Sequence, residues 1–290
     1  MDFAEYQEAT RSTDQRLDKE LADIVVHLLG LAGEAGSVAA VYKKKLRDGE
    51  AYSTWKANIR EEMGDVLWYL ATLASKFDLD LGEIAEANLE KTRSRWLPTP
   101  ADQLDSDYPE PEQLPRLGSY RFVASVGENE RPMVQVFLNG TRVGNALTDA
   151  SHVDDGYRFH DIFHLAHATI LGWSPVTRSL LGRKRRSNAV VDEAEDGGRA
   201  IVVEEGVAAL VFAYATRHNY LDGVNRLDQQ LLDSIQLVVS GTEVGVRSSA
   251  DWEAAILAGY EMFRQLVLNN GGTVTFDADA RTLTFLPDAE

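Results

Sequence analysis

Carboxylates stand inside two otherwise apolar helical patterns near the start of the chain, and this placement constrains the fold more than any other feature. The run 31–37 contains Glu34, and the run 60–69 contains Glu61, Glu62 and Asp65. Helix positions three or four apart share a face, so the second set forms one acidic cluster. Burying unpaired carboxylates is costly, so the cluster needs a cation. Oxygen ligands favour Mg²⁺ or Mn²⁺, which points to phosphate chemistry.

The periodicity around these runs predicts a small all-α bundle. Apolar residues recur at helical spacing over residues 3–12, 18–47, 54–77 and 80–95. The last of these segments sets Asn88, Lys91 and Arg95 at i, i+3 and i+7, on one face of the helix. A unit of about 95 residues with a wide apolar face is marginal by itself.

Residues 1–96 resemble the MazG-like all-α nucleoside triphosphate pyrophosphohydrolases, whose signature is a Glu-x-x-Glu pair on one helix and a Glu-x-x-Asp pair on the next. The likeness extends beyond the acids. It includes the Tyr6-Gln7 opening helix, Gly-Leu-Ala-Gly-Glu-Ala-Gly at 30–36, Lys43, Lys44 and Lys45, Asp-Val-Leu-Trp-Tyr-Leu at 65–70, and Ala-Asn-Leu-Glu-Lys at 87–91.

The resemblance implies an Mg²⁺- or Mn²⁺-dependent hydrolase that cleaves a nucleoside triphosphate between its α- and β-phosphates, giving a monophosphate and pyrophosphate. It also implies a homodimer or homotetramer assembled through the bundle. The implied metal ligands are Glu34, Glu62 and Asp65. The other implied roles are water activation by Glu61 or Glu62, charge neutralisation by Lys91 and Arg95, and substrate contacts by Lys43, Asn88 and Trp68, of which Trp68 can equally be a core residue.

Ser37 departs from this pattern, because it stands where the family's first pair ends in a second Glu. A hydroxyl is a weak, neutral ligand, so the site loses one negative charge and can hold one ion where relatives hold two. The alternative is therefore an impaired site, in which the bundle binds nucleotide as a sensor and regulates the C-terminal part of the chain.

Composition excludes several classes of protein. The net charge of −17 disfavours general nucleic-acid binding, and the absence of cysteine excludes disulfides, thiolate metal sites and cysteine nucleophiles. No apolar run approaches the roughly 20 residues of a membrane helix, and no basic segment followed by an apolar stretch opens the chain. We therefore expect a cytoplasmic protein without a membrane partner.

Residues 97–116 interrupt the helical pattern. They hold five of the eight prolines together with Asp102, Asp105, Asp107, Glu110 and Glu112. Proline cannot donate to a helix ladder and like charges repel, so we predict an extended, exposed linker. It would separate an N-terminal domain, residues 1–96, from a C-terminal domain, residues 117–290.

The C-terminal domain reads as α+β with a hairpin at each end, which makes the chain mainly α overall. Residues 120–126 and 133–143 are β-branched and aromatic, and Asn139-Gly140 is a strong two-residue hairpin signal. The predicted helices cover about 157–171, 200–218, 226–240 and 250–269, and a second hairpin pairs 273–276 with 282–286.

A histidine stripe marks the first of these helices. His160, His164 and His167 fall at i, i+4 and i+7, with Asp161 beside them. Glu204 and Glu205 occupy an apolar run on a later helix, where a carboxylate needs a partner. Facing helices of this kind can hold Zn²⁺, Mn²⁺ or Fe and carry a metal-dependent activity. The alternatives are a buried hydrogen-bonded network without metal and a ligand pocket.

Two charge blocks of opposite sign follow in this domain. The basic block is residues 183–186, and the acidic block is residues 192–196. Such blocks predict an exposed, flexible loop. The alternative is an arm that folds over the phosphates of a nucleotide.

Overall fold

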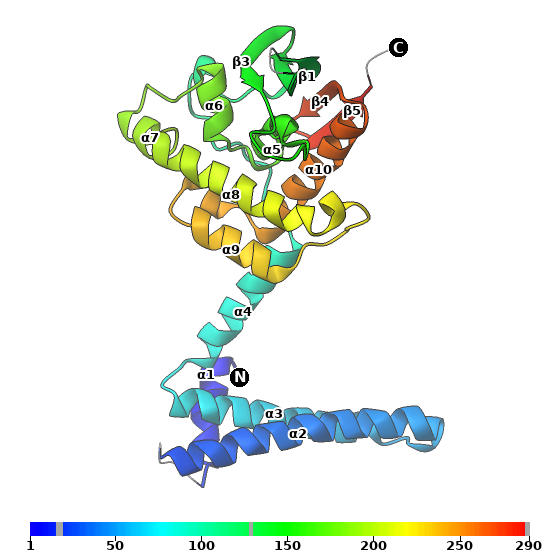
Figure 1. The fold of residues 1–290 in the computed structure, drawn as a ribbon. Helices are drawn as coiled ribbons and strands as arrows, with labels where there is room; N and C mark the ends of the chain where they lie inside the picture. The colour runs from blue at the N-terminus through cyan, green and yellow to red at the C-terminus, as the bar shows by residue number, and fades with distance from the viewer. Residues whose placement is uncertain (16–19, 128–129, 288–290) are drawn as a thin grey trace. The chain divides into compact units, whose positions relative to one another are not determined.

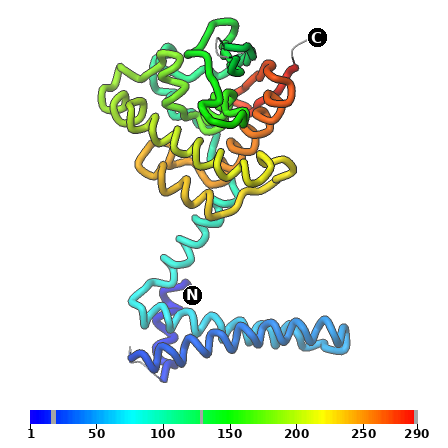
Figure 2. The backbone as a smooth tube through the Cα atoms, in the orientation of Figure 1, coloured from blue at the N-terminus to red at the C-terminus, as the bar shows by residue number. Residues whose placement is uncertain are grey.

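The chain divides into two compact units, Met1–Thr92 and Arg93–Glu290 (Figures 1 and 2). The computed structural model describes residues 1–15, 20–127 and 130–287. The first unit is helical, and the second combines helices with an antiparallel sheet. The predicted fold class, mainly α with an α+β C-terminal part, is confirmed.

The first unit is built on two long helices that lie side by side (Figure 1). Its helices are α1 (Phe3–Thr10), α2 (Leu21–Asp48), α3 (Trp55–Lys76) and the first part of α4 (Leu81–Trp96). These bounds agree with the predicted segments to within a few residues at each end. Residues 18 and 19, where the second helix was expected to begin, lie outside the described residues.

Two side chains fix how these helices pack. A Cβ atom at Gly30 of α2 would lie 2.3 Å from ring atoms of Tyr69 on α3, so only glycine allows this approach. The buried Gln7 amide donates to the Leu79 carbonyl at 2.8 Å and accepts from the Leu81 N–H at 2.8 Å. Gln7 therefore ties α1 to the start of α4 and satisfies an N–H that the helix leaves open.

The first unit buries little apolar surface of its own. Its buried cluster consists of Ala71, Ala74 and Leu81, with Tyr6 and Leu67 packed against it. Large apolar side chains on its helices remain exposed, among them Leu21, Leu29, Leu46 and Met63. So small a core leaves a wide apolar face uncovered.

One helix of the first unit contradicts the prediction that the chain has no apolar segment long enough to span a membrane. Among the described residues, the helical segment Leu21–Ala51, which is α2 with the 3-10 turn Gly49–Ala51 that follows it, is long and apolar enough to span a membrane. The mean hydropathy of its most apolar 18 residues is 1.7, and 11% of that stretch is buried. The prediction was wrong, because small and apolar residues on both sides of Glu34 keep the mean hydropathy of this helix high. A single helix of this kind is weak evidence for a membrane span, since core helices of soluble proteins can be equally long and apolar.

The described strands of the second unit form one antiparallel sheet in the order β3-β2-β1-β4-β5. The strands are β1 (Leu117–Val126), β2 (Pro132–Leu138), β3 (Thr141–Leu147), β4 (Gly271–Asp277) and β5 (Thr282–Leu286). Asn139 and Gly140 both have positive φ, as the predicted two-residue turn requires. The two expected hairpins are joined, because β1 pairs with β4 and sets Tyr120 opposite Val274.

Helices pack on this sheet and enclose the main core. They are α5 (Asp161–Ala166), α6 (Pro175–Leu181), α7 (Ala189–Ala194), α8 (Gly198–Thr216), α9 (Gln229–Val239) and α10 (Ser249–Leu268). Helix α10 contacts α5, β4 and β5, and Trp173, Trp252 and Tyr260 are almost fully buried in the core. A π-helical turn, His167–Leu171, continues α5, and the sequence patterns missed both α6 and α7.

Residues 97–116 are not the exposed linker that their prolines and acids predicted. Asp105 is fully buried, and Leu114 is 2% exposed. The Asp105 carboxylate accepts from the Leu114 N–H at 2.7 Å and from Arg178 of α6 at 2.5 Å, and it pairs with Arg116. The segment belongs to the second unit, because its acid finds cationic partners there instead of repelling its neighbours.

The charge blocks at 183–186 and 192–196 are only partly the exposed loop that was predicted, because one residue of each block is buried. Arg185 and Asp196 are fully buried, and their side chains pair at 2.7 Å. The Arg185 guanidinium also contacts Glu243 at 2.6 Å, and α7 lies between the blocks. Opposite charges close in sequence have folded onto each other, so Arg185 is already neutralised and is not available as a phosphate-binding arm.

Candidate functional site

Three carboxylates converge between the two long helices of the first unit. Glu34 comes from α2, and Glu62 and Asp65 come from α3. One oxygen of each lies within 4.8 Å of the others, with Glu34 and Glu62 half-buried and Asp65 exposed. The set offers only oxygen atoms and three negative charges, which is the donor type that Mg²⁺ and Mn²⁺ prefer. These residues fit the divalent ion that the sequence predicted.

Two further polar residues, Glu61 and Ser37, lie one helical turn from members of the acid cluster. Glu61 is exposed on α3, one turn before Asp65, so its carboxylate can meet a solvent molecule on the same face. Ser37 is half-buried on α2, one turn after Glu34. Helical spacing thus puts Glu61 and the Ser37 hydroxyl next to the three converging carboxylates, and their part in the site stays a prediction.

Tyr6 of α1 also lies near the cluster, and the sequence patterns gave it no role. Burial and the negative charge of Asp65 together raise the pKa of its hydroxyl. Its ring packs against the buried cluster of the unit, beside Leu67. The Tyr6 hydroxyl therefore keeps its proton at neutral pH and feels the charge of Asp65. The only sequence signal was its place in the opening helix.

Trp68 is held by its neighbours in the first unit. Its indole N–H donates to the Thr13 hydroxyl at 2.8 Å, and its ring stacks on His27 at 5.8 Å. The His27 ring is buried and bonds to Asp14 at 3.1 Å. These contacts favour the interpretation of Trp68 as a core residue, and its contact with substrate stays a prediction.

The lysines at the end of α2 do not join the acid cluster. Lys43 is exposed, and its nine-residue distance from Glu34 rotates it by about 180° around the helix axis. Lys45 shares the face of Glu34, but it bonds to the Gly49 carbonyl at 3.0 Å and to Glu50 at 2.9 Å. Lys44 lies over the Tyr52 ring. Their approach to phosphates stays a prediction.

The polar face of α4 is divided between the two units. Asn88 and Lys91 are exposed in the first unit, and Leu81 is the buried residue of this helix. Arg95 belongs to the second unit, where its guanidinium pairs with Glu253 at 3.1 Å and donates to the Leu227 carbonyl at 3.0 Å. The predicted face exists as a helix face, but Arg95 is engaged within the second unit.

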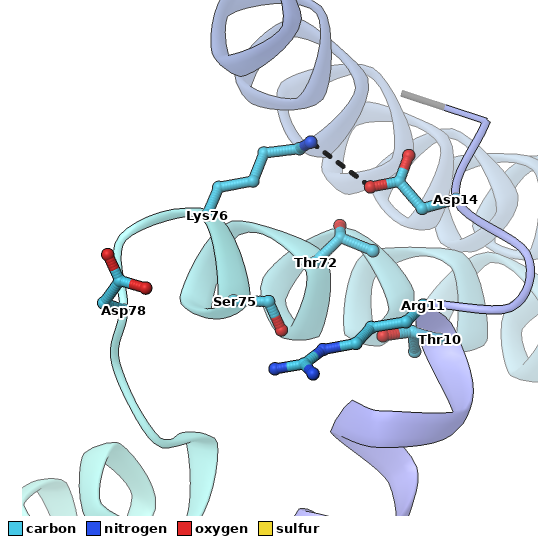
Figure 3. A pocket seen from close by; sticks show the side chains of 7 residues that line it. All are labelled: Thr10, Arg11, Asp14, Thr72, Ser75, Lys76 and Asp78. Carbon is cyan, nitrogen blue, oxygen red and sulfur yellow. Dashed lines mark ion pairs between the residues drawn. The ribbon is translucent and has the colours of Figure 1, made fainter. Parts of the chain in front are cut away.

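A pocket of about 290 Å³ opens near the end of α3 (Figure 3). Lys76 points across it and pairs with Asp14 at 3.2 Å. It is lined by Thr10, Arg11, Asp14, Thr72, Ser75, Lys76 and Asp78. Its two cationic and two anionic side chains cancel in formal charge, so the pocket offers no net positive field to a phosphate. None of the substrate residues expected from the sequence lines it.

The histidine stripe of the second unit meets α8 at a single carboxylate. Burial alone would lower the pKa of His164 and raise that of Glu204. Their ion pair outweighs burial, so the pKa of His164 is raised and that of Glu204 is lowered. Glu204 accepts from His164 Nδ1 at 2.9 Å, His167 Nδ1 at 3.1 Å, Ser174 Oγ at 2.8 Å and the Val176 N–H at 2.9 Å. Glu204 is thus the hub of a buried polar network.

Comparison with known families matches residues 28–96 to the MazG nucleotide pyrophosphohydrolase domain and residues 99–289 to the MazG C-terminal domain. The chain belongs to the MazG family. Membership implies nucleotide pyrophosphohydrolase activity, and the matched domain contains all three converging carboxylates. The family generally uses divalent metal ions, in agreement with an all-oxygen donor set.

The chain is also similar to the Gene 37 protein of Mycobacterium phage L5, with 42% identity over 69 residues. The match covers 23% of this chain and 60% of that relative. No solved structure matches the chain.

Proposed function

We propose that the first unit of this MazG-family protein hydrolyses nucleoside triphosphates between the α- and β-phosphates, releasing a nucleoside monophosphate and pyrophosphate. The observation that carries the proposal is the convergence of Glu34, Glu62 and Asp65 from two helices within 4.8 Å. Family membership supplies the reaction class. Glu34, Glu62 and Asp65 would hold Mg²⁺ or Mn²⁺, which when bound neutralises phosphate charge and makes water more acidic.

Side chains of the first unit would orient the attacking water, accept its proton and stabilise the leaving group. Water attacks the α-phosphorus, the bond to the bridging oxygen breaks, and pyrophosphate leaves. Glu61 orients the attacking water and accepts its proton, because its exposed carboxylate lies one turn before Asp65. Lys91 neutralises the leaving pyrophosphate and Asn88 holds a phosphate or ribose oxygen. Arg95 would have to leave Glu253 to share the role of Lys91.

Product analysis tests the proposal directly. The purified chain is incubated with each ribo- and deoxyribonucleoside triphosphate plus Mg²⁺ or Mn²⁺, and the products are separated by ion exchange. We expect equal amounts of monophosphate and pyrophosphate from at least one substrate. Diphosphate with inorganic phosphate would contradict cleavage at the α–β bridge.

A substitution at Ser37 tests whether the first unit is an active enzyme or a nucleotide sensor with an impaired site. We expect Ser37→Glu to change kcat/KM by about tenfold or less, because the three carboxylates already suffice for one ion. The matched control is Ser12→Glu, a change at an exposed serine of the same unit. A gain of about a hundredfold or more in Ser37→Glu alone would instead favour the sensor.

We also propose that a second copy of the chain covers the apolar face of α2 and α3 in a homodimer or homotetramer. The support is the small buried cluster of the unit beside so many exposed apolar side chains. Light scattering during size exclusion should give two or four times the mass of one chain. Leu29→Glu, at a side chain 66% exposed on α2, should lower that mass, whereas Leu237→Glu, 78% exposed on α9, should not. A monomeric wild-type chain at micromolar concentration would contradict the assembly.

A further inference from the structure

A buried nitrogen of the histidine stripe has no hydrogen-bond partner among the described residues. It is Nε2 of His164, whose side chain is 1% exposed. The other ring nitrogen, Nδ1, bonds to Glu204 at 2.9 Å, so the ring is fixed with Nε2 pointing away from the polar network. Leaving a buried polar atom unpaired is costly, so this atom calls for a ligand.

His160, one turn earlier, is oriented in the same way. Its Nδ1 bonds to the Tyr157 carbonyl at 2.8 Å, and its ring stacks on that of Tyr157 at 4.4 Å. Its Nε2 lies 3.6 Å from a carboxylate oxygen of Asp161. Histidines that bind metals are held in this manner, with one nitrogen bonded to a carbonyl or carboxylate and the other directed at the ion.

Two carboxylates face these nitrogens. Asp161 is near His160, and an oxygen of Glu205 on α8 lies 3.6 Å from His164 Nε2. Donor atoms of His160, Asp161 and His164 lie within 4.8 Å of one another. Distances of 3.6 Å exceed those of good hydrogen bonds. They agree with the separation of about 3.3–3.6 Å between ligand atoms that lie 2.0–2.2 Å from a tetrahedral ion.

We propose that Nε2 of His160, Nε2 of His164 and the carboxylates of Asp161 and Glu205 bind a divalent first-row transition-metal ion in the second unit. Two imidazoles with two carboxylates suit Zn²⁺, Mn²⁺ or Fe²⁺ better than Mg²⁺ or Ca²⁺. Glu204 is a positioning residue, because its oxygens are occupied by His164, His167 and Ser174. The ion takes the place of the proton on each Nε2 atom.

The exposed fractions of the four proposed ligands favour an ion that solvent can reach over a closed structural site. His164 is buried, His160 and Asp161 are 15% and 13% exposed, and Glu205 is 43% exposed. The site thus opens to solvent on the side of Glu205, where water or an anionic or carbonyl ligand can complete the coordination. His167 packs against Trp252 and its Nδ1 bonds to Glu204 at 3.1 Å, so we assign it to the network around Glu204 and not to the ligand set.

Zinc titration of the full chain tests this proposal. The background carries Glu62→Gln and Asp65→Asn, which removes two of the three converging carboxylates of the first unit, so the result does not depend on turnover or on the proposed function. Calorimetry on the chelator-treated background should find one tightly bound Zn²⁺ per chain. His160→Gln should weaken this binding by about tenfold or more. With Co²⁺ as the probe, the background should show visible absorption that His160→Gln loses.

His218→Gln is the matched control. The Nδ1 atom of His218 also bonds to a helical carbonyl, that of Tyr214 at 2.7 Å, but His218 is exposed. It should keep both the affinity and the Co²⁺ absorption. Glu205→Gln, at the exposed edge of the site, is a second test should His160→Gln fail to fold. Equal Zn²⁺ affinity in the background, His160→Gln and Glu205→Gln chains, or only millimolar binding in the background, would overturn the proposal.

Discussion

Asp65→Asn is expected to lower kcat/KM for nucleoside triphosphate hydrolysis by about a thousandfold or more, because it removes one of three ligand charges from the ion that neutralises the phosphates. The fold should survive, since Asp65 is exposed and Asn has nearly the same shape. Steady-state kinetics, with pyrophosphate release as the readout, measure the loss.

A thermal measurement separates loss of the ion from loss of the fold. Without metal, Asp65→Asn should melt at the wild-type temperature or slightly above it, because it relieves repulsion from Glu34 and Glu62. With Mg²⁺ in excess, the wild type should gain stability by mass action and the variant should gain little. Glu86→Gln, at an exposed acid of α4, is the control and should keep both activity and metal response. Full activity in Asp65→Asn would exclude the acid cluster as the catalytic centre.

Part of the carboxylate convergence could be expected from the residues themselves because it depends on local spacing. Glu62 and Asp65 share a helix face by their spacing alone, whereas Glu34, on another helix, was added only by the resemblance to the MazG-like family. The Asn139-Gly140 turn was likewise confirmed, since its geometry depends on those two residues and their positive φ. Features of this kind need little knowledge of the rest of the fold.

Partners that are distant in sequence could not be predicted in this way. Arg95 was placed on the correct face of α4, but its partner Glu253 lies 158 positions later. The pairing of Tyr120 with Val274 joins strands from opposite ends of the second unit. Asp105 read as one of several repelling acids because Arg178, its partner, is 73 positions away. In each case the sequence pattern identified one residue of the pair but gave no information about its distant partner.

Asp105→Ala is expected to destabilise the second unit by about 3–5 kcal/mol, because it removes the nearer carboxylate partner of the buried Arg178 guanidinium and leaves Asp196, 3.5 Å from Arg178 Nε, to neutralise it. It also removes the acceptor of the Leu114 N–H. Urea unfolding followed by tryptophan fluorescence, to which the buried Trp173 and Trp252 contribute, measures the change. Asp107→Ala, at an exposed acid of the same segment, should change the free energy of unfolding by less than about 0.5 kcal/mol. Equal effects of the two substitutions would mean that residues 97–116 do not fold as part of the second unit.

The pH dependence of the Asp105 effect follows from its surroundings. Burial alone would raise the pKa of Asp105, but the Leu114 N–H and the guanidinium groups of Arg178 and Arg116 outweigh burial and hold the pKa below its ordinary value. A carboxyl with a depressed pKa stabilises the fold fully above its unfolded pKa of about 3.9 and loses this contribution as pH falls through the folded pKa. The difference in unfolding free energy between wild type and Asp105→Asn should therefore be constant from pH 7 to about 5 and narrow below about pH 4. A difference that stayed constant below pH 4 would mean that Asp105 does not carry its charge in the folded chain, and that Arg178 is neutralised by Asp196 alone.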